Sequence, residues 1–257
     1  MTSGSTSGLV LDARPLDAGV SVAFTTRSGG VSAAPYGTLN LSDTVGDETL
    51  VVDRNRELVL HGLGPAAGQP AGPRGLAWMR QVHGADVAYA GDLGPSESPE
   101  VDAIYSDSPE IALAVLVADC APVLIADREA GLIGAAHAGR PGMAAAVVPA
   151  LVAAMTKAGG APARMTAVIG PAICGRCYEV PRQMRDDVAG VVPGSGCSTR
   201  QGTPGIDLRA GLRGQLARCG VGAVADDARC TAESPELYSY RRDGRTGRFA
   251  GLIWLAA

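Results

Sequence analysis

The sequence lacks the features that mark membrane, secreted and nucleic-acid-binding proteins. No apolar run approaches the roughly 20 residues that a membrane-spanning helix needs. The first residues, MTSGSTSG, have neither the basic nor the apolar region of a signal peptide. The net charge is −4, so no basic excess indicates binding to nucleic acid or to an acidic membrane. Six cysteines are scattered over 257 residues, which argues against a disulfide scaffold and fits a reducing compartment. We therefore expect a cytoplasmic protein.

The composition is typical of a loop-rich α/β protein that can bury a core, with 35 glycines, 17 prolines and 46% apolar residues. Apolar segments continue on both sides of each loop, so we expect one domain over residues 20–257, after an N-terminal tail over residues 1–19 and with a connector at 65–75. Strands are expected at 20–26, 76–82, 101–105, 113–118, 123–126, 132–136, 165–170, 223–226, 237–242 and 249–255. Helices are expected at 47–63, 140–158, 181–192 and 208–219.

One apolar run ends in two reactive side chains. Residues 113–122 read LAVLVADCAP, which predicts a buried strand that stops at Asp119 and Cys120. Burial removes solvation from both a carboxylate and a thiol, so their place at the end of a buried strand requires a reason.

Two of the three histidines also follow short apolar runs. His83 comes after residues 76–82, and His137 comes after residues 132–136. With Cys120, three strand-like segments each deliver one ligand, and this set is typical of a catalytic zinc site with an open fourth position. The alternative is a buried cysteine with two ordinary histidines.

Two segments have the character of anion sites. Arg27 precedes Gly29 and Gly30, whose backbone amides can approach an anion closely, although a simple strand-to-loop turn explains the same pattern. Arg140 opens a predicted helix directly after His137, and a helix N-terminus attracts anions. A phosphate bound there would lie next to the metal.

Three further features have less specific interpretations. Cys174 and Cys177 form a C-x-x-C pair without a second pair or a suitably spaced histidine, so we interpret them as structural. His61 lies near the end of a predicted helix, where the helix dipole favours a histidine, and we interpret it as structural or solvated. Tyr240, with Arg241 and Arg242, is compatible with a site for a base and an anion, or with an amphipathic sheet edge.

Short motifs along the chain resemble those of one protein family. They are TTRSGGVS at 25–32, LNL at 39–41, QVHG at 81–84, Asp102-Ala103, ADC at 118–120, HAG at 137–139, IGP at 169–171, CYEV at 177–180, Cys230-Thr231 and SYRR at 239–242. On these motifs the chain resembles, from residue 25 onward, the bacterial YfiH-type laccase-domain proteins. Members of that family have been called polyphenol oxidases, purine nucleoside phosphorylases and peptidoglycan editing factors.

The resemblance implies a single α/β domain of layered mixed sheets with outer helices, an α/β/β/α sandwich. It also implies that His83, Cys120 and His137 bind zinc. The activity attributed to the family is phosphorolysis of purine nucleosides, with adenosine deamination and methylthioadenosine cleavage alongside. The family usually has Trp-Arg after HAG, whereas this chain has Arg140 and Pro141, which shifts the guanidinium by one residue and affects the anion contact.

We therefore expect a zinc-dependent purine nucleoside phosphorylase whose partners are a nucleoside and phosphate. In deamination a metal-activated water attacks the purine C6, and Asp119 or Asp102 moves the proton. In phosphorolysis phosphate attacks the ribose C1′ as the base leaves. The residues expected to bind substrate or phosphate are Arg27, Gly29, Gly30, Asn40, Arg140 and Arg241.

Three alternatives belong to other classes. Cys120 as a nucleophile with His137 as its base would make a thiol hydrolase or amidase that edits cell-wall precursors without a metal. A multicopper oxidase needs more imidazoles than three histidines supply, although a single copper ion at the Cys–His site would oxidise phenols slowly. A non-enzymatic protein with structural zinc needs a fourth ligand, for which Cys174 or Cys177 would have to fold across.

Overall fold

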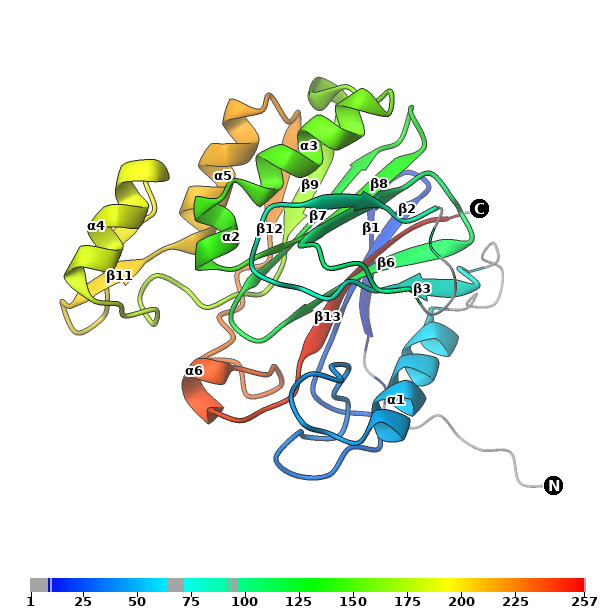
Figure 1. Cartoon of the computed structure of the whole chain (residues 1–257), viewed down its shortest axis with the longest axis horizontal. Helices are drawn as coiled ribbons and strands as arrows, with labels where there is room; N and C mark the ends of the chain where they lie inside the picture. The colour runs from blue at the N-terminus through cyan, green and yellow to red at the C-terminus, as the bar shows by residue number, and fades with distance from the viewer. Residues whose placement is uncertain (1–8, 10, 64–71, 92, 94–96, 257) are drawn as a thin grey trace.

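Two mixed sheets form the centre of the molecule, which we describe from a computed structural model over residues 9, 11–63, 72–91, 93 and 97–256 (Figure 1). The five-stranded sheet has the order β1 (Leu11–Asp17), β2 (Val20–Thr25), β13 (Phe249–Leu255), β6 (Ile111–Val117) and β3 (Gly75–Ala77). The six-stranded sheet has the order β12 (Ala223–Asp226), β9 (Thr166–Ile169), β7 (Ala121–Asp127), β8 (Leu132–Ala138), β5 (Ala103–Ser106) and β4 (Val87–Tyr89). A separate ribbon pairs β10 (Gly196–Ser198) with β11 (Pro204–Ile206).

Helices cover the outer face of each sheet. The outer face of the six-stranded sheet packs against α3 (Val147–Lys157) and α5 (Leu208–Arg218), next to α2 (Arg140–Ala144) and α4 (Arg182–Val191) (Figure 1). On the opposite side α1 (Thr49–Gly62) packs its buried Val59 against the five-stranded sheet. The last helix, α6 (Tyr240–Asp243), is a single turn before β13. This arrangement confirms the α/β/β/α sandwich.

The central strands are apolar along their whole length because both of their faces are buried. Side chains alternate across a strand, so Val22 and Phe24 of β2 face the layer between the sheets while Ala23 faces the α1 layer. In β7 Leu124 faces the layer between the sheets, and Ile125 faces the helices on the other side. The apolar runs in the sequence therefore correspond to strands covered on both sides.

The run at 113–122 is the place where the chain changes sheets. It ends β6 in the five-stranded sheet and begins β7 in the six-stranded sheet, so the expected strand stops before Asp119 and Cys120. Asp119 makes this turn with a φ of 94°, in the left-handed region that non-glycine residues rarely adopt. The turn brings the two reactive side chains to the shared end of both sheets.

Two expected elements differ from the structure. The helix expected over 140–158 is divided into α2 and α3 at Ala146, whose φ is 65°. Gly142 allows α2 to lie close to the backbone of Gly84, since a Cβ atom at residue 142 would lie 3.2 Å from the carbonyl oxygen of Gly84. The strand expected over 237–242 is wrong, because the Ser239 side chain caps α6 by accepting from the Arg242 amide.

Other boundaries differ by a few residues. The strand expected at 76–82 is reduced to β3, and His83 follows a loop instead of a strand. Part of the expected tail over 1–19 is β1, which pairs antiparallel with β2 in the sheet. Residues 1–8 and 10 of that tail, and residues 65–71 of the expected connector, lie outside the described residues.

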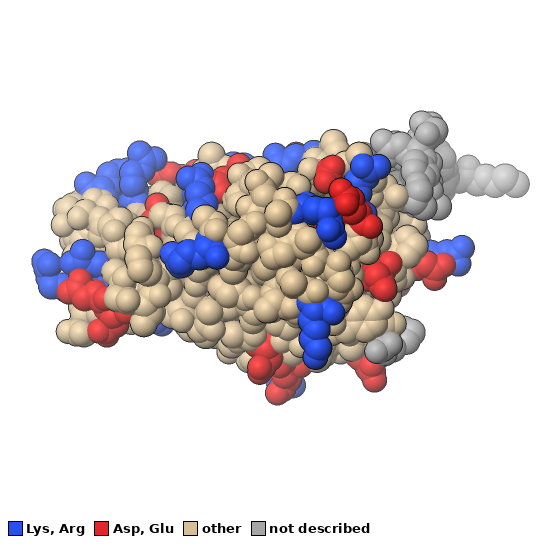
Figure 2. Space-filling view, turned by 90° about the horizontal axis from the view of Figure 1, so that it is seen from above, with Lys and Arg blue, Asp and Glu red and all other residues tan. Residues whose placement is uncertain are grey.

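Two features of the described residues concern the surface charge and the length of the helices. On the face shown in Figure 2, the Lys and Arg side chains of the described residues are interspersed with Asp and Glu. None of the helices formed by the described residues is long and apolar enough to cross a bilayer.

Candidate metal centre and substrate cavity

The structure brings His83, Cys120 and His137 together from three different segments. Their ligand atoms all lie within 4.8 Å of one another, and the Sγ atom of Cys120 is 4.0 Å from Nε2 of His83. The two imidazole rings meet edge to face, with centroids 4.8 Å apart. Ligand atoms on one tetrahedral zinc ion are about 3.3–3.8 Å apart, so small side-chain movements would let the set hold a metal ion.

A buried carboxylate orients two of these ligands. Oδ1 of Asp102 accepts from Nδ1 of His137 at 2.7 Å and from the backbone amide of His83 at 3.0 Å. Its Oδ2 accepts from the amides of Gly84 and Val82 at 2.7 and 3.1 Å. Burial acts to raise the pKa of Asp102, but the bonds from His137 and from the backbone outweigh it and lower that pKa. With Nδ1 engaged by a carboxylate, His137 has Nε2 available for a metal.

Gly139 keeps the space between the ligands open. A Cβ atom at this position would lie 2.8 Å from Sγ of Cys120 and 3.0 Å from Cδ2 of His83. Such contacts are shorter than van der Waals packing allows, so a side chain at residue 139 would displace both ligands. The glycine of the HAG motif is therefore required by the closeness of Cys120 and His83.

The ligand loops adopt unusual backbone conformations. His83 has a φ of 61° and Asp119 has a φ of 94°. Non-glycine residues in this region cost free energy, and they persist where surrounding contacts hold them. His83 is held by the hydrogen bond that its backbone amide donates to Asp102. Asp119 is held by three donors: the hydroxyls of Thr231 and Ser239 at 2.6 and 2.7 Å, and the amide of Arg241 at 2.6 Å.

The pKa shifts of Cys120 and His137 favour an ion pair between them when no metal is bound. Burial acts to raise the pKa of Cys120, but His137 and then His83 lower it to about 6. Burial acts in the opposite sense on His137, yet Cys120 and Asp102 raise its pKa to about 9. At neutral pH the metal-free site is thus a thiolate beside an imidazolium.

A cavity of about 860 Å³ opens in front of the three ligands. Its volume is in the range that holds a small-molecule substrate. Arg140, Arg241 and Arg248 lie on its wall together with Tyr178 and Tyr240. The Arg241 guanidinium lies 5.2 Å from the centre of the Tyr178 ring, a distance that permits a cation–π contact. The cavity therefore combines a metal-ligand set with cations and aromatic faces.

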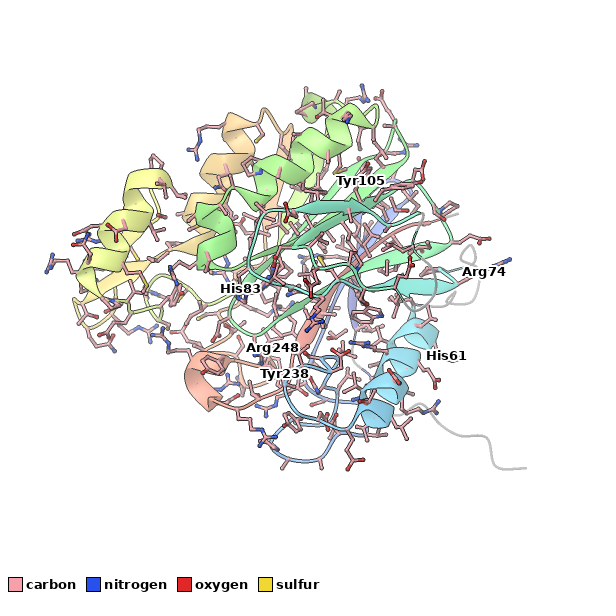
Figure 3. The ribbon with its side chains drawn as sticks, in the orientation of Figure 1. His61, Arg74, His83, Tyr105, Tyr238 and Arg248 are labelled. Atoms are coloured by element: carbon pink, nitrogen blue, oxygen red, sulfur yellow. The ribbon has the colours of Figure 1, made fainter. Side chains whose placement is uncertain are left out.

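Arg248 is a cavity residue that no motif in the sequence indicated. Figure 3 shows Arg248 and His83 in the central part of the molecule and His61 on α1. Burial lowers the pKa of Arg248, and the negative groups Cys120 and Asp119 act to raise it. The available signal is weak: an arginine stands directly before the buried strand β13.

Asn40 lies behind Arg248 and is fully buried. Its Oδ1 accepts from the Arg248 amide at 2.9 Å and from the Ser42 amide at 3.1 Å. Arg248 and Ser42 both line the cavity, whereas Asn40 is not on its wall as the described residues form it. Asn40 thus positions residues of the cavity.

Arg27, Gly29 and Gly30 are not brought to this cavity as it is lined by the described residues. The Arg27 guanidinium lies 3.5 Å from an oxygen of Asp243 and 5.3 Å from the centre of the Tyr238 ring. The amides of Gly29 and Gly30 donate to the hydroxyl of Thr38 at 3.0 and 3.4 Å. The glycine pair is thus used inside its own loop, which corresponds to the simpler of the two sequence interpretations.

Of the remaining candidate residues, some line the cavity and others lie away from it. Asp119 and Arg140 line the cavity, whereas Asp102 is completely buried and does not reach the wall formed by the described residues. Nδ1 of His61 lies 2.7 Å from the carbonyl oxygen of Glu57 on α1, in agreement with its structural interpretation. Cys174 and Cys177 do not fold across to this site but belong to a second group of side chains.

Comparison with known proteins gives consistent results. A family model described as multi-copper polyphenol oxidoreductase laccase matches residues 21–256. A purine nucleoside phosphorylase of Streptomyces griseus is 51% identical over 94% of this chain and 96% of its own length. The crystal structure of a Neisseria meningitidis protein superposes with a TM-score of 0.83 at 38% identity, covering 97% of this chain and 99% of its own. The crystal structure of YlmD from Geobacillus stearothermophilus gives a TM-score of 0.85 at 31% identity, covering 100% and 98%.

The ion pair predicts an unusually reactive thiol in metal-free protein. Because the thiolate is the nucleophile, alkylation of Cys120 by iodoacetamide should rise with pH through a midpoint of about 6 and then level off. The rate is measured by mass spectrometry of the Cys120 peptide. Cys219 is the internal control: burial raises its pKa, so its rate should still be rising at pH 9. A Cys120 rate that follows the Cys219 profile would contradict the ion pair.

The contact with Asp102 predicts a loss of metal affinity on substitution. In Asp102→Asn the amide cannot accept from all four donors, so the zinc concentration that half-protects Cys120 from alkylation should rise about 10–100-fold. Asp187→Asn, at an exposed carboxylate on α4, is the matched control and should leave that concentration unchanged. Circular dichroism verifies that both variants are folded. Equal protection of the two variants would show that Asp102 does not orient the ligands.

Proposed function

The chain belongs to the YfiH-type laccase-domain family, and we propose that it is a zinc-dependent purine nucleoside phosphorylase. The observation that carries this proposal is the cavity in which a Cys–His–His set with an open side shares the wall with five arginines, among them Arg140, Arg241 and Arg248. Curated relatives with 37–51% identity are named purine nucleoside phosphorylases.

The donor set fits zinc. One thiolate and two imidazoles are three zinc ligands of the kind found in catalytic sites, and the gap kept open by Gly139 lies between two of them. When bound, zinc would supply Lewis-acid polarisation of a substrate oxygen. His83, Cys120 and His137 would hold it, and Asp102 would fix the tautomer of His137.

The arginines suit the phosphate. In phosphorolysis a phosphate oxygen forms a bond to the ribose C1′, the bond from C1′ to the purine nitrogen breaks, and the base leaves with the electron pair and gains a proton. Arg140, Arg241 and Arg248 face this cavity, and guanidinium groups bind phosphate through charge-assisted hydrogen bonds. They would position the nucleophile and reduce its repulsion from the developing negative charge on the base.

The two acidic candidates are assigned different tasks. Asp119 lines the cavity beside Cys120 and would hold or transfer the proton that the leaving base gains. Asp102 is a positioning residue, because its oxygens accept four hydrogen bonds and it is shielded from the cavity. Tyr178 and Tyr240 offer aromatic faces on which a purine can stack.

Adenosine deamination is a proposed side activity of the same cavity. There water adds to the purine C6 and the amino group leaves as ammonia, with Asp119 carrying the proton. Cleavage of methylthioadenosine would follow the phosphorolytic route. The six free cysteines suit the reducing conditions of a cytoplasm, which we propose as the location.

The ion pair between Cys120 and His137 favours one second candidate, a metal-free Cys–His hydrolase that edits cell-wall precursors. The structure gives less support to a multicopper oxidase. All three histidines are described, and only His83 and His137 reach the site, whereas such oxidases use imidazoles at several copper ions. One copper ion in place of zinc would give slow phenol oxidation at most.

A product assay tests the main proposal. Zinc-loaded protein should convert adenosine and phosphate to adenine and ribose 1-phosphate, and chromatography separates these from inosine. Cys120→Ala should lower the rate by more than about 100-fold, because it removes a metal ligand whose supporting contacts alone affect activity by 10–100-fold. Cys219→Ser should retain the rate. Inosine formed without phosphate would identify deamination as the main reaction, and no product from nucleosides would exclude both and favour the hydrolase.

The anion contact is tested by comparing two arginines. Arg140→Ala should raise the KM for phosphate by about 10-fold or more, since it removes a charge-assisted hydrogen bond worth roughly 1.5–3 kcal/mol. Arg27→Ala should leave this KM unchanged because Arg27 pairs with Asp243 away from the cavity. An increase with Arg27→Ala and none with Arg140→Ala would restore the phosphate site expected from the TTRSGGVS motif.

A further inference from the structure

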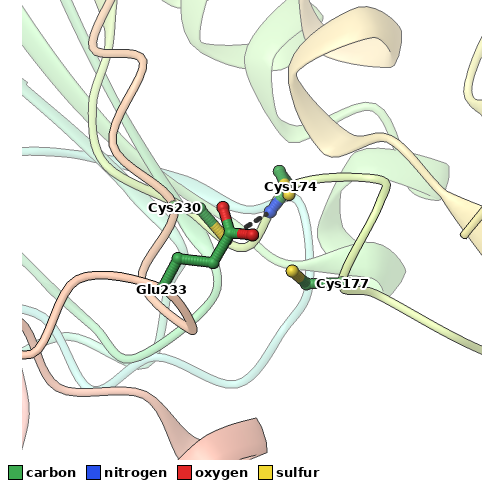
Figure 4. A group of neighbouring side chains, drawn as sticks. All are labelled: Cys174, Cys177, Cys230 and Glu233. Carbon is green, nitrogen blue, oxygen red and sulfur yellow. Dashed lines mark hydrogen bonds between the residues drawn. The ribbon is translucent and has the colours of Figure 1, made fainter. Parts of the chain in front are cut away.

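A second cluster of potential ligands lies apart from the His83 set. Figure 4 shows Cys174, Cys177, Cys230 and Glu233 converging from two segments of the chain. One ligand atom from each lies within 4.8 Å of every other. This cluster shares no residue with the Cys120 site, and the proposed nucleoside chemistry does not use it.

The two segments present their ligands through the same local structure. The carbonyl oxygen of Cys174 accepts from the amides of Cys177 and Tyr178, both at 2.9 Å. The carbonyl oxygen of Cys230 accepts from the amides of Glu233 and Ser234, at 3.0 and 2.9 Å. Each segment is therefore a tight turn that places the side chains at its first and fourth positions on one side. The sequence pattern is C-x-x-C followed by C-x-x-E.

The backbone joins the two turns. The Cys174 amide donates to Sγ of Cys230 at 3.3 Å, and Ala172 forms a bridge to Cys230. An amide that donates to a sulfur stabilises negative charge on it, as expected around a metal thiolate. The C-x-x-C pair thus has Cys230 and Glu233 as further potential ligands. The spacing along the sequence did not reveal them, because 52 residues separate Cys177 from Cys230.

The charges around the cluster also fit a metal ion. Three thiolates and a carboxylate around a divalent ion leave a net charge of −2. Arg200 forms an ion pair with Oε1 of Glu233, and Arg176 is a second cation that interacts with this carboxylate. The amide of Arg200 also donates to the carbonyl oxygen of Arg176 at 3.1 Å. Two guanidinium groups therefore lie close enough to offset the charge of the filled site.

We propose that Cys174, Cys177, Cys230 and Glu233 form a second metal site that holds a structural zinc ion. Four protein ligands close the coordination shell, and closed tetrahedral sites rich in thiolates are structural. A disulfide would use only two of the three sulfurs. The convergence of four ligands from two matching turns favours the metal.

The ion would stabilise one wall of the substrate cavity. Ile173 and Tyr178, which flank the first turn, both line the cavity. In the second turn Thr231 follows Cys230 and donates its hydroxyl to Asp119 at 2.6 Å. Linking the two turns would therefore fix the position of Tyr178 relative to Asp119 on the cavity wall.

Metal counting on untagged full-length protein tests the proposal. Mass spectrometry of metals should find two zinc ions per chain in the unmodified protein and in Cys219→Ser. It should find one in Cys120→Ala, one in Cys230→Ser and none in the double variant. A single zinc ion in the unmodified protein that Cys230→Ser retains would overturn the proposal. So would a disulfide between any two of the three cysteines in the purified protein.

Cobalt gives a test that is independent of turnover. In Cys120→Ala, added Co²⁺ should give the visible bands of tetrahedral coordination and a charge-transfer band from three thiolates. Removing Cys177 in addition (Cys177→Ser) should reduce that band by about a third, whereas Glu233→Gln should preserve it. Absence of tetrahedral Co²⁺ in Cys120→Ala would overturn the second site. The proposal of nucleoside phosphorolysis at the first site would still stand.

Two exposed positions test the site if the cysteine variants do not fold. Glu233→Gln removes the carboxylate ligand, and Arg200→Met removes its outer partner. Each should speed the transfer of one zinc ion to a chelator by about 10-fold or more. Arg74→Met, at an exposed arginine paired with Glu110, is the matched control and should not change the transfer. Equal transfer rates for all of these proteins would contradict the ligand set.

Discussion

The contact on which the candidate site depends most is the one between the buried Asp102 carboxylate and its four donors. A buried charge is costly unless hydrogen bonds replace its lost hydration, and here three amides and one imidazole do so. The same bonds hold His83 in a strained backbone conformation and select the free nitrogen of His137. One side chain therefore determines the geometry of two ligands that lie 54 positions apart.

The second constraint is the crossing of the chain between the two sheets. Asp119 and Cys120 occupy the turn from β6 to β7, so the site lies where both sheets end. The Asp119 carboxylate then binds Thr231, Ser239 and the amide of Arg241, which attaches the C-terminal segment to this turn. The cavity is assembled from the ends of several elements, and its arginines come from positions as distant as 56 and 248.

The same three side chains support two chemistries, depending on what occupies the space between them. Without a metal, a thiolate and an imidazolium neutralise each other, and this is the arrangement of a thiol nucleophile. With a metal, Cys120 and His137 both become ligands, and the imidazolium loses its proton while the thiolate binds the ion and is no longer a free nucleophile. The choice between phosphorylase and hydrolase is thus a choice about metal occupancy.

The sequence by itself predicted most strands, because burial on both faces leaves continuous apolar runs, and it predicted the set of His83, Cys120 and His137 from ligands that follow such runs. The layers were predicted from the resemblance of its motifs to a known family. The sequence did not determine which loops meet. Arg248 reaches the cavity while Arg27 pairs with Asp243, and Cys230 with Glu233 completes a cluster that the C-x-x-C pair alone does not indicate. The turn at Ser239 also involves a distant segment, because the Ser239 hydroxyl donates to Asp119. Local patterns report burial and periodicity, whereas the pairing of loop ends follows from the order of strands in two packed sheets, and only the tertiary structure decides that order.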